Sequence, residues 1–573
     1  MRLLAASAVL GGILVASCAK DEPRSTDTMP PGSTSDAGSA VTSTPITSSA
    51  PKVKGLADLH VHMMAEDAFG GAWFHGTHDA GPVDCDGGFP PSDHARVKQD
   101  LRVLLEQCPP TSLIPWSAGG IVSTLFGASG AAASEFIGKI PGTEGDTGLH
   151  LGRRRANTDF PRWDTIAHHQ VWERWLEEAH AKGLSLMVMS AVTFDFLCKL
   201  MPDANRDRPC DEGADIDVQL AKTHDFVARN ASWAEIALGP ADARRIIGEG
   251  KLAIVLSVEA SGLFENGGDW RPVFEHLWSQ GVRTLQMAHQ LDNRFVGAAL
   301  HNPIFHVAEY VKNCHIDTDC GKTIGGVTLG FDVDASCKNV RGLTAEGADF
   351  AREMMKRGMP LDLAHVSERG TADLFALAQQ NGYYPLYLSH AHFREIMNPE
   401  LAATEKTTPA EVVRMVRQTG GLVGLRTAHD ETHGYTGSGV PNDCAGSSKS
   451  FAQAFTFGQK ELKVGLALGS DFNGFIQQTR PRFGPNGACS AGSDPSGQAA
   501  LQAGAGNTDF DTKGLAHIGL VPDLLADLGR MGVDTSTLDD SAERYLAMWE
   551  RASSVRTGPA EEAADLATGG VVP

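Results

Sequence analysis

The stretch GLTAEGADFAREMMKRGMPLDLAH, residues 342–365, contains the unit that decides the fold. Its first part, residues 342–358, has apolar side chains at helical spacing and ends in Gly358, a residue typical of helix C-termini. Residues 360–365 follow as a short apolar strand that ends in His365. A helix that leads directly into a buried strand is the repeating unit of parallel α/β folds.

The same unit recurs along most of the chain. Short, mostly continuous apolar runs predict eight strands, at 56–62, 184–192, 252–259, 282–288, 360–365, 385–390, 421–427 and 464–471. Such runs are typical of parallel strands covered on both faces. Amphipathic segments such as 165–182 and 409–419 lie between them. The pattern predicts an α/β fold, a (β/α)₈ TIM-like barrel. An open doubly wound sheet is the alternative, although no Gly-x-Gly-x-x-Gly follows the first strand.

Two connections between the predicted strands are far too long for simple loops. Residues 63–164 and 290–341 are both rich in Gly, Pro and Cys. We expect them to form two large insertions that cap the C-terminal face of the barrel. The barrel with its insertions is expected to occupy residues 55–553, and residues 554–573 are expected to be a frayed tail.

The N-terminal segment has the layout of an export signal. Residues 1–18, MRLLAASAVLGGILVASC, place an apolar stretch after Arg2 and small residues before Cys18. This ending resembles a bacterial lipobox, in which the cysteine carries lipid; a plain secretory peptide is the alternative. Residues 19–54 are rich in Ser, Thr and Pro and lack aromatic residues, which predicts a flexible tether. We therefore expect an exported protein, lipid-anchored in the bacterial cell envelope.

Composition excludes several classes of protein. The chain has 573 residues, 42% of them apolar, and a net charge of −21, which is typical of a globular protein. The acidic balance, without Lys/Arg blocks, argues against nucleic acid as a partner. Ten cysteines without a Cys-x-x-Cys motif argue against a thiolate zinc knuckle. Two local pairs, Cys198 with Cys210 and Cys314 with Cys320, are predicted disulfides in an oxidising compartment.

Most of the predicted strands end in a residue that can bind a metal or move a proton. These residues are His60, His62, Glu259, His289, His365, His390 and Asp471. The C-terminal ends of barrel strands meet at one face, so we expect these side chains to lie together. Imidazole and carboxylate are ligands of Zn²⁺, and a carboxylate can bridge two ions. The pattern predicts a metal site that activates water for hydrolysis.

On these residues the chain resembles the membrane dipeptidases (renal-dipeptidase-like, peptidase family M19) of the amidohydrolase superfamily. The motifs that carry the resemblance are ADARRIIGEGKLAIVLSVEASG (241–262), GLTAEGADFAREMMKRGMPLDLAHVS (342–367), LSHAH (388–392), GSDFNG (469–474) and, more weakly, 514–532. The resemblance implies two Zn²⁺ ions, or other divalent metals. One ion would be held by His60, His62 and Glu259, and the other by Glu259, His365 and His390.

The resemblance also implies two catalytic roles. His289 would polarise the scissile carbonyl, and Asp471 would take a proton from the water that bridges the metals and return it to the leaving amine. The arginine that grips the substrate carboxylate in the family has no direct counterpart. Lys406 falls near it by spacing, and Arg426 and Arg394 are the competing candidates.

Three departures from the family pattern stand out. The first strand has His60-x-His62 where the family has His-x-Asp, so the site carries one negative charge fewer. The family's Asp-Phe-Asp-Gly is Asp471-Phe472-Asn473-Gly474, and its Gly-Gly-Asn near the chain end reads Asp540-Ser541-Ala542. These changes bear on strict dipeptide specificity more than on hydrolysis.

The expected function is that of a zinc-dependent hydrolase of dipeptides or similar small substrates. One alternative is a related amidohydrolase that acts on another amide, a lactone or an ester. The other is a non-catalytic surface lipoprotein that binds a metal or a ligand. The expected partners are a small-molecule or dipeptide substrate and a membrane, through the lipid; a homodimer is left open.

Overall fold

The computed structural model describes residues 51–81 except 72 and 75, residues 162–164, residues 168–484 except 202, 266, 321–326, 430, 431 and 433, and residues 487–489, 494 and 509–554. The predicted export signal with Cys18, most of the tether, most of the insertion 63–164 and the tail from 555 lie outside these residues. In the described part of the chain, no helix is both long and apolar enough to span a bilayer.

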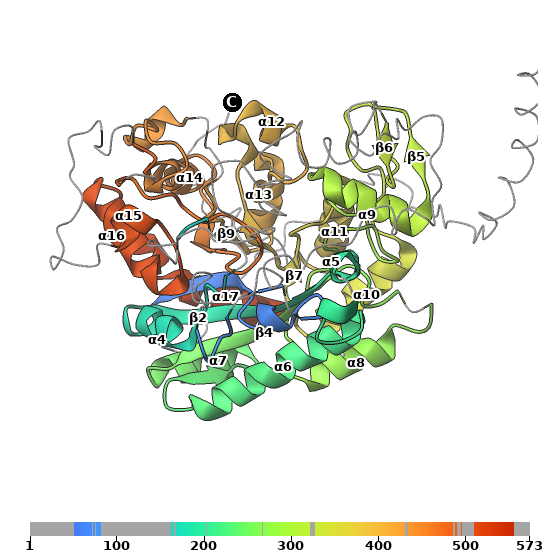
Figure 1. Ribbon diagram of the computed structural model, residues 1–573, viewed down its shortest axis with the longest axis horizontal. Coiled ribbons are helices and arrows are strands. Elements are labelled where there is room, and N and C mark those ends of the chain that lie inside the picture. The colour runs from blue at the N-terminus through green and yellow to red at the C-terminus, as the bar shows by residue number, and fades with distance from the viewer. Residues whose placement is uncertain are drawn as a thin grey trace, which may run out of the picture.

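Eight parallel strands form one sheet, in the order β3-β4-β2-β1-β10-β9-β8-β7 (Figure 1). The strands are β1 (Leu56–Val61), β2 (Leu184–Thr193), β3 (Ala234–Ile236), β4 (Leu252–Ala260), β7 (Leu361–Asp362), β8 (Leu386–Ala391), β9 (Leu422–Leu425) and β10 (Gly465–Leu468). β1, β2, β4 and β8 are buried along almost their whole length, as continuous apolar runs predict.

Residues 282–286 join the two ends of this row of strands. Val282 forms a parallel bridge to Leu256 in β4, and Gln286 forms one to Asp362 in β7. The backbone N–H of Gln286 donates to the carbonyl oxygen of Val258 at 3.0 Å. The circuit therefore passes through all eight predicted strand positions, and the predicted α/β TIM-like barrel is confirmed.

The segment 282–288 and β3 differ from the prediction in detail. β3, which was not predicted, pairs with Leu252–Ile254 at the start of β4. It thereby occupies the edge of β4 at its N-terminal end. The segment 282–288 therefore pairs with β4 only from Leu256 onward, through isolated bridges. β3 has three residues and only Ala234 is buried, which leaves no apolar run to detect.

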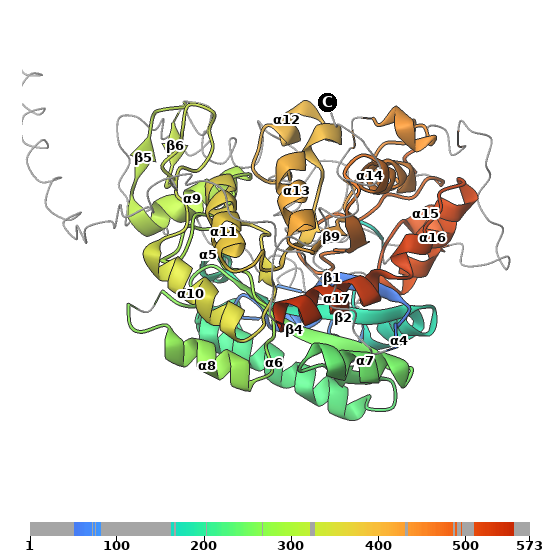
Figure 2. The ribbon, with the colours of Figure 1, turned by 180° about the vertical axis from the view of Figure 1, so that it is seen from behind.

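Helices surround the barrel (Figures 1 and 2). They are α4 (Glu173–Ala181), α5 (Asp195–Leu200), α6 (Glu212–Arg229), α7 (Pro240–Gly248), α8 (Arg271–Ser279), α9 (Pro303–Asn313), α10 (Ala345–Lys356), α11 (Glu368–Gln380), α12 (Pro399–Ala402), α13 (Ala410–Gln418), α14 (Ser448–Lys460), α15 (Asp509–Lys513), α16 (Val521–Arg530) and α17 (Ser541–Ala552). In the unit 342–365, the Thr344 hydroxyl caps α10 and Gly358, at φ 70°, leads the chain into β7.

The insertion 290–341 is described except for residues 321–326. It contains α9 and a short antiparallel pair, β5 (Ile316–Asp317) with β6 (Thr328–Leu329). Apolar side chains of α9 share a separate hydrophobic cluster with Phe69, Trp73 and Phe194. This second core fastens the insertion to the end of β2 and to the first residues after β1.

Three disulfides join described cysteines. The predicted bond between Cys198 and Cys210 is confirmed, and Cys444 bonds Cys489. The predicted pairing of Cys314 with Cys320 is wrong, because Cys320 is bonded to Cys337, with 5.2 Å between their Cα atoms. The β5–β6 pair folds the chain back and brings these two cysteines together. Cys314 is also disulfide-bonded.

Candidate metal centre

The predicted metal ligands converge at the C-terminal ends of four strands. His60 lies on β1 with His62 just beyond it, and Glu259 is the penultimate residue of β4. His365 follows β7, and His390 lies on β8. His60 and His62 are each 1% exposed and Glu259 is 2% exposed, so these groups face one another inside the barrel mouth.

Glu259 stands at the centre of the cluster. Its Oε2 lies 3.3 Å from Nε2 of His60 and 3.1 Å from Nε2 of His62. Its Oε1 lies 3.1 Å from Nε2 of His365 and 3.6 Å from Nε2 of His289. The two oxygens of one carboxylate thus face two separate pairs of imidazoles, an arrangement suited to bridging two ions.

His390 completes the cluster from β8. Its Nε2 lies 3.0 Å from Nε2 of His365, and its ring stacks on His60 with centroids 4.1 Å apart. In this region two trios of described side chains have ligand atoms within mutual reach: His60, His62 and Glu259, and Glu259, His289 and His365. The structure therefore brings the first predicted trio together, and places His289 beside Glu259 and His365 in addition to His390.

The donor set fits a divalent cation. Nε2 of His60 is buried without a hydrogen-bond partner. Nδ1 of His62 lies 2.8 Å from the carbonyl oxygen of Ser190; a carbonyl only accepts, so Nδ1 carries a proton. A backbone acceptor of this kind typically orients metal-binding histidines. Nitrogen and carboxylate oxygen ligands in this number suit zinc or a similar metal.

The charge states also suit a cation. Burial favours the neutral form of Glu259, but hydrogen bonds with His365 and His60 help to hold its pKa well below the usual range, so it is ionised. Burial lowers the pKa of His289 to about 3, so that imidazole is neutral. Burial opposes a charge on His62 as well, yet hydrogen bonds to Asp471 and Glu259 raise its pKa to about 10.

Asp471 follows β10 and faces the same cluster. Its Oδ1 lies 3.2 Å from Nε2 of His62, and its Oδ2 lies 3.2 Å from a guanidinium nitrogen of Arg426. Burial favours protonation, but His62 and Arg426 lower its pKa below the ordinary value, so the carboxylate is ionised. Asp471, Asn473 and Phe475 all have positive φ, as does His365. Such left-handed backbone at non-glycine residues is costly and clusters at functional sites.

Two further side chains link the site to the insertion 290–341. The side-chain amide nitrogen of Gln290 donates to Nε2 of His289 at 2.9 Å, and Oε1 of Gln290 lies 3.0 Å from Nε2 of His301. Neither residue was predicted. His301 follows no predicted strand, so only the folded insertion reveals it. Gln290 stands next to His289, but a glutamine side chain neither moves a proton nor is a usual metal ligand, so its type gave no signal.

The cavity beside the predicted metal ligands is lined by Lys406 and Arg426, two of the predicted substrate-binding residues. Arg394 does not line it. The Arg394 guanidinium bonds Glu368 at 2.6 Å and the carbonyl oxygens of Thr404 and Thr407, so it fixes the loop that carries Lys406. The sequence could not separate these cations, because an arginine near a strand end can support a loop as readily as it faces a ligand.

Two of the departures from the family pattern have structural explanations. The side-chain amide nitrogen of Asn473 donates to the carbonyl oxygen of His62 at 3.0 Å, which a carboxylate could not do. Ser541 lies at the opposite end of the barrel, where its hydroxyl accepts from the backbone N–H of Ala57 near the start of β1. The change at residues 540–542 therefore lies away from the metal centre.

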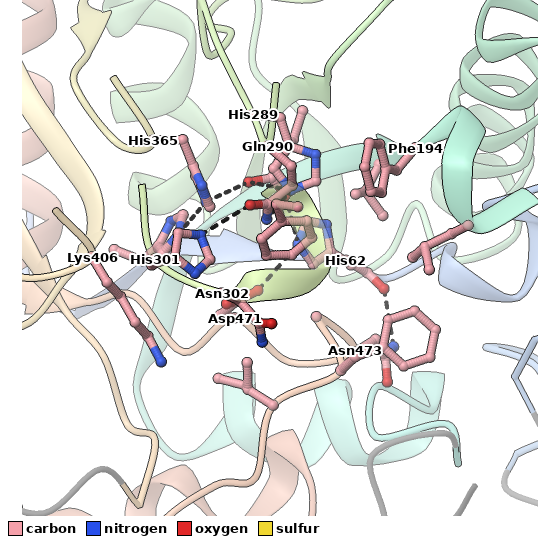
Figure 3. Close-up of a pocket in the computed structure, with 18 of the residues that line it drawn as sticks. His62, Phe194, His289, Gln290, His301, Asn302, His365, Lys406, Asp471 and Asn473 are labelled. Carbon is pink, nitrogen blue, oxygen red and sulfur yellow. Dashed lines mark hydrogen bonds and ion pairs between the residues drawn. The ribbon is translucent and has the colours of Figure 1, made fainter. Parts of the chain in front are cut away.

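Figure 3 shows the cavity and its labelled residues. His62, His289, His365 and Asp471 surround its centre, with Lys406 on one side and Phe194 on the other. His301 and Asn302 reach the cavity from the insertion 290–341. The arrangement offers a cation site, an ionised carboxylate and further cationic side chains in one enclosure.

Known proteins resemble parts of this chain. Residues 326–476 match the family model of the membrane dipeptidases, peptidase family M19. Dipeptidase tcpJ of Claviceps purpurea (strain 20.1) is 25% identical over 190 residues, 33% of this chain and 34% of that protein. An uncharacterized protein in the pqqA 5′ region of Klebsiella pneumoniae is 24% identical over 207 residues, 36% of this chain and 61% of that protein. The match thus spans about a third of the first relative and three fifths of the second.

Two solved structures are similar at low identity. The dipeptidase AC, a metallo peptidase of family M19, has a TM-score of 0.43 and 15% identity, covering 71% of this chain and 96% of that chain. A metallo peptidase from Rhodobacter sphaeroides, liganded with a phosphinate mimic of the dipeptide L-Ala-D-Ala, has a TM-score of 0.42 and 15% identity, covering 71% and 97%. The family match includes His365, His390 and Asp471. The resemblance recognised in the sequence is confirmed: this chain is similar to the membrane dipeptidases of peptidase family M19.

Proposed function

We propose that this protein is a zinc-dependent hydrolase that cleaves the amide bond of dipeptides or similar small substrates. The observation that carries the proposal is the position of Glu259, whose two buried oxygens face imidazole nitrogens on both sides. A carboxylate that faces imidazoles on both sides, with an ionised Asp471 beside it, is the arrangement expected of a hydrolase that uses two metal ions.

Two Zn²⁺ ions fit the proposal. His60, His62 and Glu259 would hold one ion, and Glu259, His365 and His390 the other. Bound there, the ions would polarise the scissile carbonyl and lower the pKa of the attacking water.

The side chains around the ligands would move the protons. Oδ1 of Asp471 would accept a proton from the attacking water and then give it to the nitrogen of the leaving amine. Arg426, 3.2 Å from Oδ2, leaves Oδ1 directed at the site. His289, which burial keeps neutral, would donate from its protonated ring nitrogen to the carbonyl oxygen as negative charge develops there.

Lys406 and Arg426 would hold the free carboxylate of the substrate. Both residues line the cavity, and Arg426 is only 8% exposed, so its charge is little screened by water. We expect Lys406→Ala to raise KM for dipeptides about tenfold to a hundredfold, the loss of one charge-assisted hydrogen bond. C-terminally amidated dipeptides are the control, and an equal rise in KM for them would remove Lys406 from this task.

The proposal is tested by assaying the zinc-loaded full chain against Xaa-Gly dipeptides, dehydrodipeptides, lactones and esters. Turnover of the dipeptides supports it. Turnover of lactones or esters alone favours the related amidohydrolase instead. Absence of any turnover in protein that carries its full metal content would reject a hydrolase.

We also propose that the protein is exported and anchored through lipid on Cys18 in the bacterial cell envelope, with residues 19–54 as the tether. The lipobox-like ending of residues 1–18 supports this. In a detergent phase-partitioning assay on lysates of cells that express it, the protein should enter the detergent phase. Cys18→Ser should move it to the aqueous phase, and an unchanged distribution would exclude the anchor.

A further inference from the structure

The cavity beside the predicted metal ligands is lined by unlike kinds of side chain. Lys406 and Arg426 are cationic. Seven other lining residues are apolar, namely Phe69, Val192, Phe194, Leu197, Phe305, Phe475 and Ile476. We call these seven residues the apolar wall. Lys406 and Phe194 lie on opposite sides of the central histidines (Figure 3).

The apolar wall is built from segments that are far apart in the sequence. Phe69 follows β1, Phe194 follows β2, Phe305 lies on α9 of the insertion 290–341, and Phe475 follows β10. The rings pack together, with centroids 5.8 Å apart for Phe194 and Phe305 and 5.5 Å for Phe69 and Phe475. All four residues are 6% exposed or less and belong to the second hydrophobic core. The wall is therefore a fixed surface.

The apolar wall contacts one of the proposed catalytic residues. Phe194 contacts His289 edge to face, with centroids 6.1 Å apart. An apolar group of a ligand bound at the metal centre would thus meet this surface. Covering it would remove apolar area from water, at about 25 cal/mol per Å².

We propose that the apolar wall binds the side chain of the amino-terminal residue of the substrate and selects large apolar side chains there. This inference rests on the proposed dipeptidase function. If Lys406 and Arg426 hold the carboxylate of the C-terminal residue and the scissile bond lies at the metal ligands, the amino-terminal residue extends to the opposite side. Phe194 of the apolar wall, with Phe305 packed on it, stands on that side (Figure 3).

Phe305 is the residue that tests this best. It lies on α9 and on none of the strands that carry the predicted metal ligands. Its ring packs on Phe194 and His301, at 5.8 Å and 4.9 Å between centroids, so the metal content of each variant is measured as well. Phe331 is a matched control, because it is a buried phenylalanine of the same insertion, 1% exposed, that does not line the cavity.

The experiment measures kcat and KM of the zinc-loaded full chain for Gly-Gly, Ala-Gly, Leu-Gly and Phe-Gly, and for Gly-Leu and Gly-Phe. We expect kcat/KM to rise from Gly-Gly to Leu-Gly and Phe-Gly. Phe305→Ala should lower the values for Leu-Gly and Phe-Gly about tenfold to a hundredfold, mainly through KM. Gly-Gly, Gly-Leu and Gly-Phe should change less than about threefold, and Phe331→Ala should show no such selectivity.

Binding gives a second readout that does not depend on turnover. Non-hydrolysable phosphinate analogues with Gly or Phe on the amino side should show the same selective loss of affinity in Phe305→Ala by calorimetry. Phe305→Leu, which keeps most of the apolar volume, should retain most of the preference and guards against misfolding of the Ala variant.

An equal loss for all substrates, or a loss that follows the carboxyl-terminal residue, would overturn the inference. Cleavage by wild type without any preference on the amino side would overturn it and leave the proposed function intact. Failure of the metal-loaded wild type to cleave any dipeptide would reject both.

Discussion

His62 and Asn473 depart from the family pattern, and the two residues are in direct contact. Asn473 is 1% exposed, and its side chain donates to the carbonyl oxygen of His62 while its Oδ1 accepts from the backbone N–H of Gln170 at 2.8 Å. The amide therefore uses both of its functions. It fixes the backbone of one proposed ligand, and the two changes form one local unit.

Replacing Asn473 with Asp tests this contact. The variant would place a carboxylate against the carbonyl oxygen of His62, because Asp has no side-chain donor when ionised. We expect the free energy of unfolding to fall by about 1–3 kcal/mol, the cost of an unsatisfied buried polar group. Chemical denaturation of metal-free protein measures this change, and unaltered stability would mean that the contact contributes nothing.

The role proposed for Asp471, proton transfer, differs from that of the proposed metal ligands. Asp471→Asn keeps the shape of the side chain but removes the base, so kcat should fall about 10²- to 10⁴-fold. The zinc content should stay at the wild-type level, because the proposed ligands are unchanged. Elemental analysis beside the kinetics separates the two roles, and loss of zinc would make Asp471 a ligand.

The candidate ligands could be listed from the sequence because each stands at or near the end of a predicted strand, and the resemblance to the membrane dipeptidases then implied which of them hold metal. The barrel then dictates that His60, Glu259, His365 and His390 meet, although they are spread over more than three hundred positions. The sequence could not predict that His301 lines the cavity or that Arg394 does not. The positions of both side chains depend on how loops fold over the mouth of the barrel, and hydrophobic periodicity in the sequence does not predict loop conformation.

At the scale of elements, one buried carboxylate ties the insertion 290–341 to the barrel. Oε2 of Glu405 accepts from the backbone N–H groups of Leu300 and Asn339, both at 3.0 Å. Its Oε1 accepts from the backbone N–H of Glu368 at the start of α11, at 2.9 Å. Glu405 precedes Lys406, so the same loop positions a proposed substrate contact and holds the insertion.

Glu405 gives a pH dependence with a definite sign. Burial raises its pKa to about 7, although three backbone N–H groups lower it. The folded state therefore holds this proton more tightly than the unfolded state does. The contribution to stability is fully present below the ordinary pKa and declines as the pH rises through about 7.

The comparison with Glu405→Gln, which does not titrate, isolates this effect. The free energy of unfolding of wild type minus that of the variant should fall between pH 4.5 and pH 7 and level off above. Denaturation of both metal-free proteins across this range measures the difference. A difference that grows with pH would contradict the assignment.

The elements themselves were predictable where one physical rule dominates. Strands covered on both faces leave continuous apolar runs, and Gly358 marks the end of a helix. β3 and the pairing of Cys320 with Cys337 escaped prediction for different reasons. β3 is too short to leave a hydrophobic pattern. The partner of Cys320 depends on how the chain folds back between the cysteines, and the spacing of cysteines in the sequence does not show this.

At the scale of the whole molecule, the two ends of the barrel have separate tasks. Near the start of β1, α17 closes the structure, with Arg244 of α7 bonding Glu543 and Glu550. At the other end lie the proposed ligands and the insertion with its own hydrophobic core. Stability and chemistry are thereby divided between opposite faces, as is usual in barrels of this kind.

The net charge adds a constraint on recognition. The chain carries 70 acidic and 49 basic residues, so its overall field is unfavourable for the carboxylate group of a substrate. Lys406 and Arg426 therefore stand out at the cavity. Together with the apolar wall, they line the cavity with both cationic and apolar groups, which suits a small amphipathic molecule.

The most direct test of the central claim is the metal content of the full chain after dialysis against Zn²⁺, measured by elemental analysis for wild type and Glu259→Gln. Glu309→Gln, at a buried glutamate outside the site, is the matched control. We predict about two ions per chain in wild type and in the control, and fewer than about one in Glu259→Gln. A wild type that binds no zinc, or a Glu259→Gln variant that binds as much as wild type, would contradict the account.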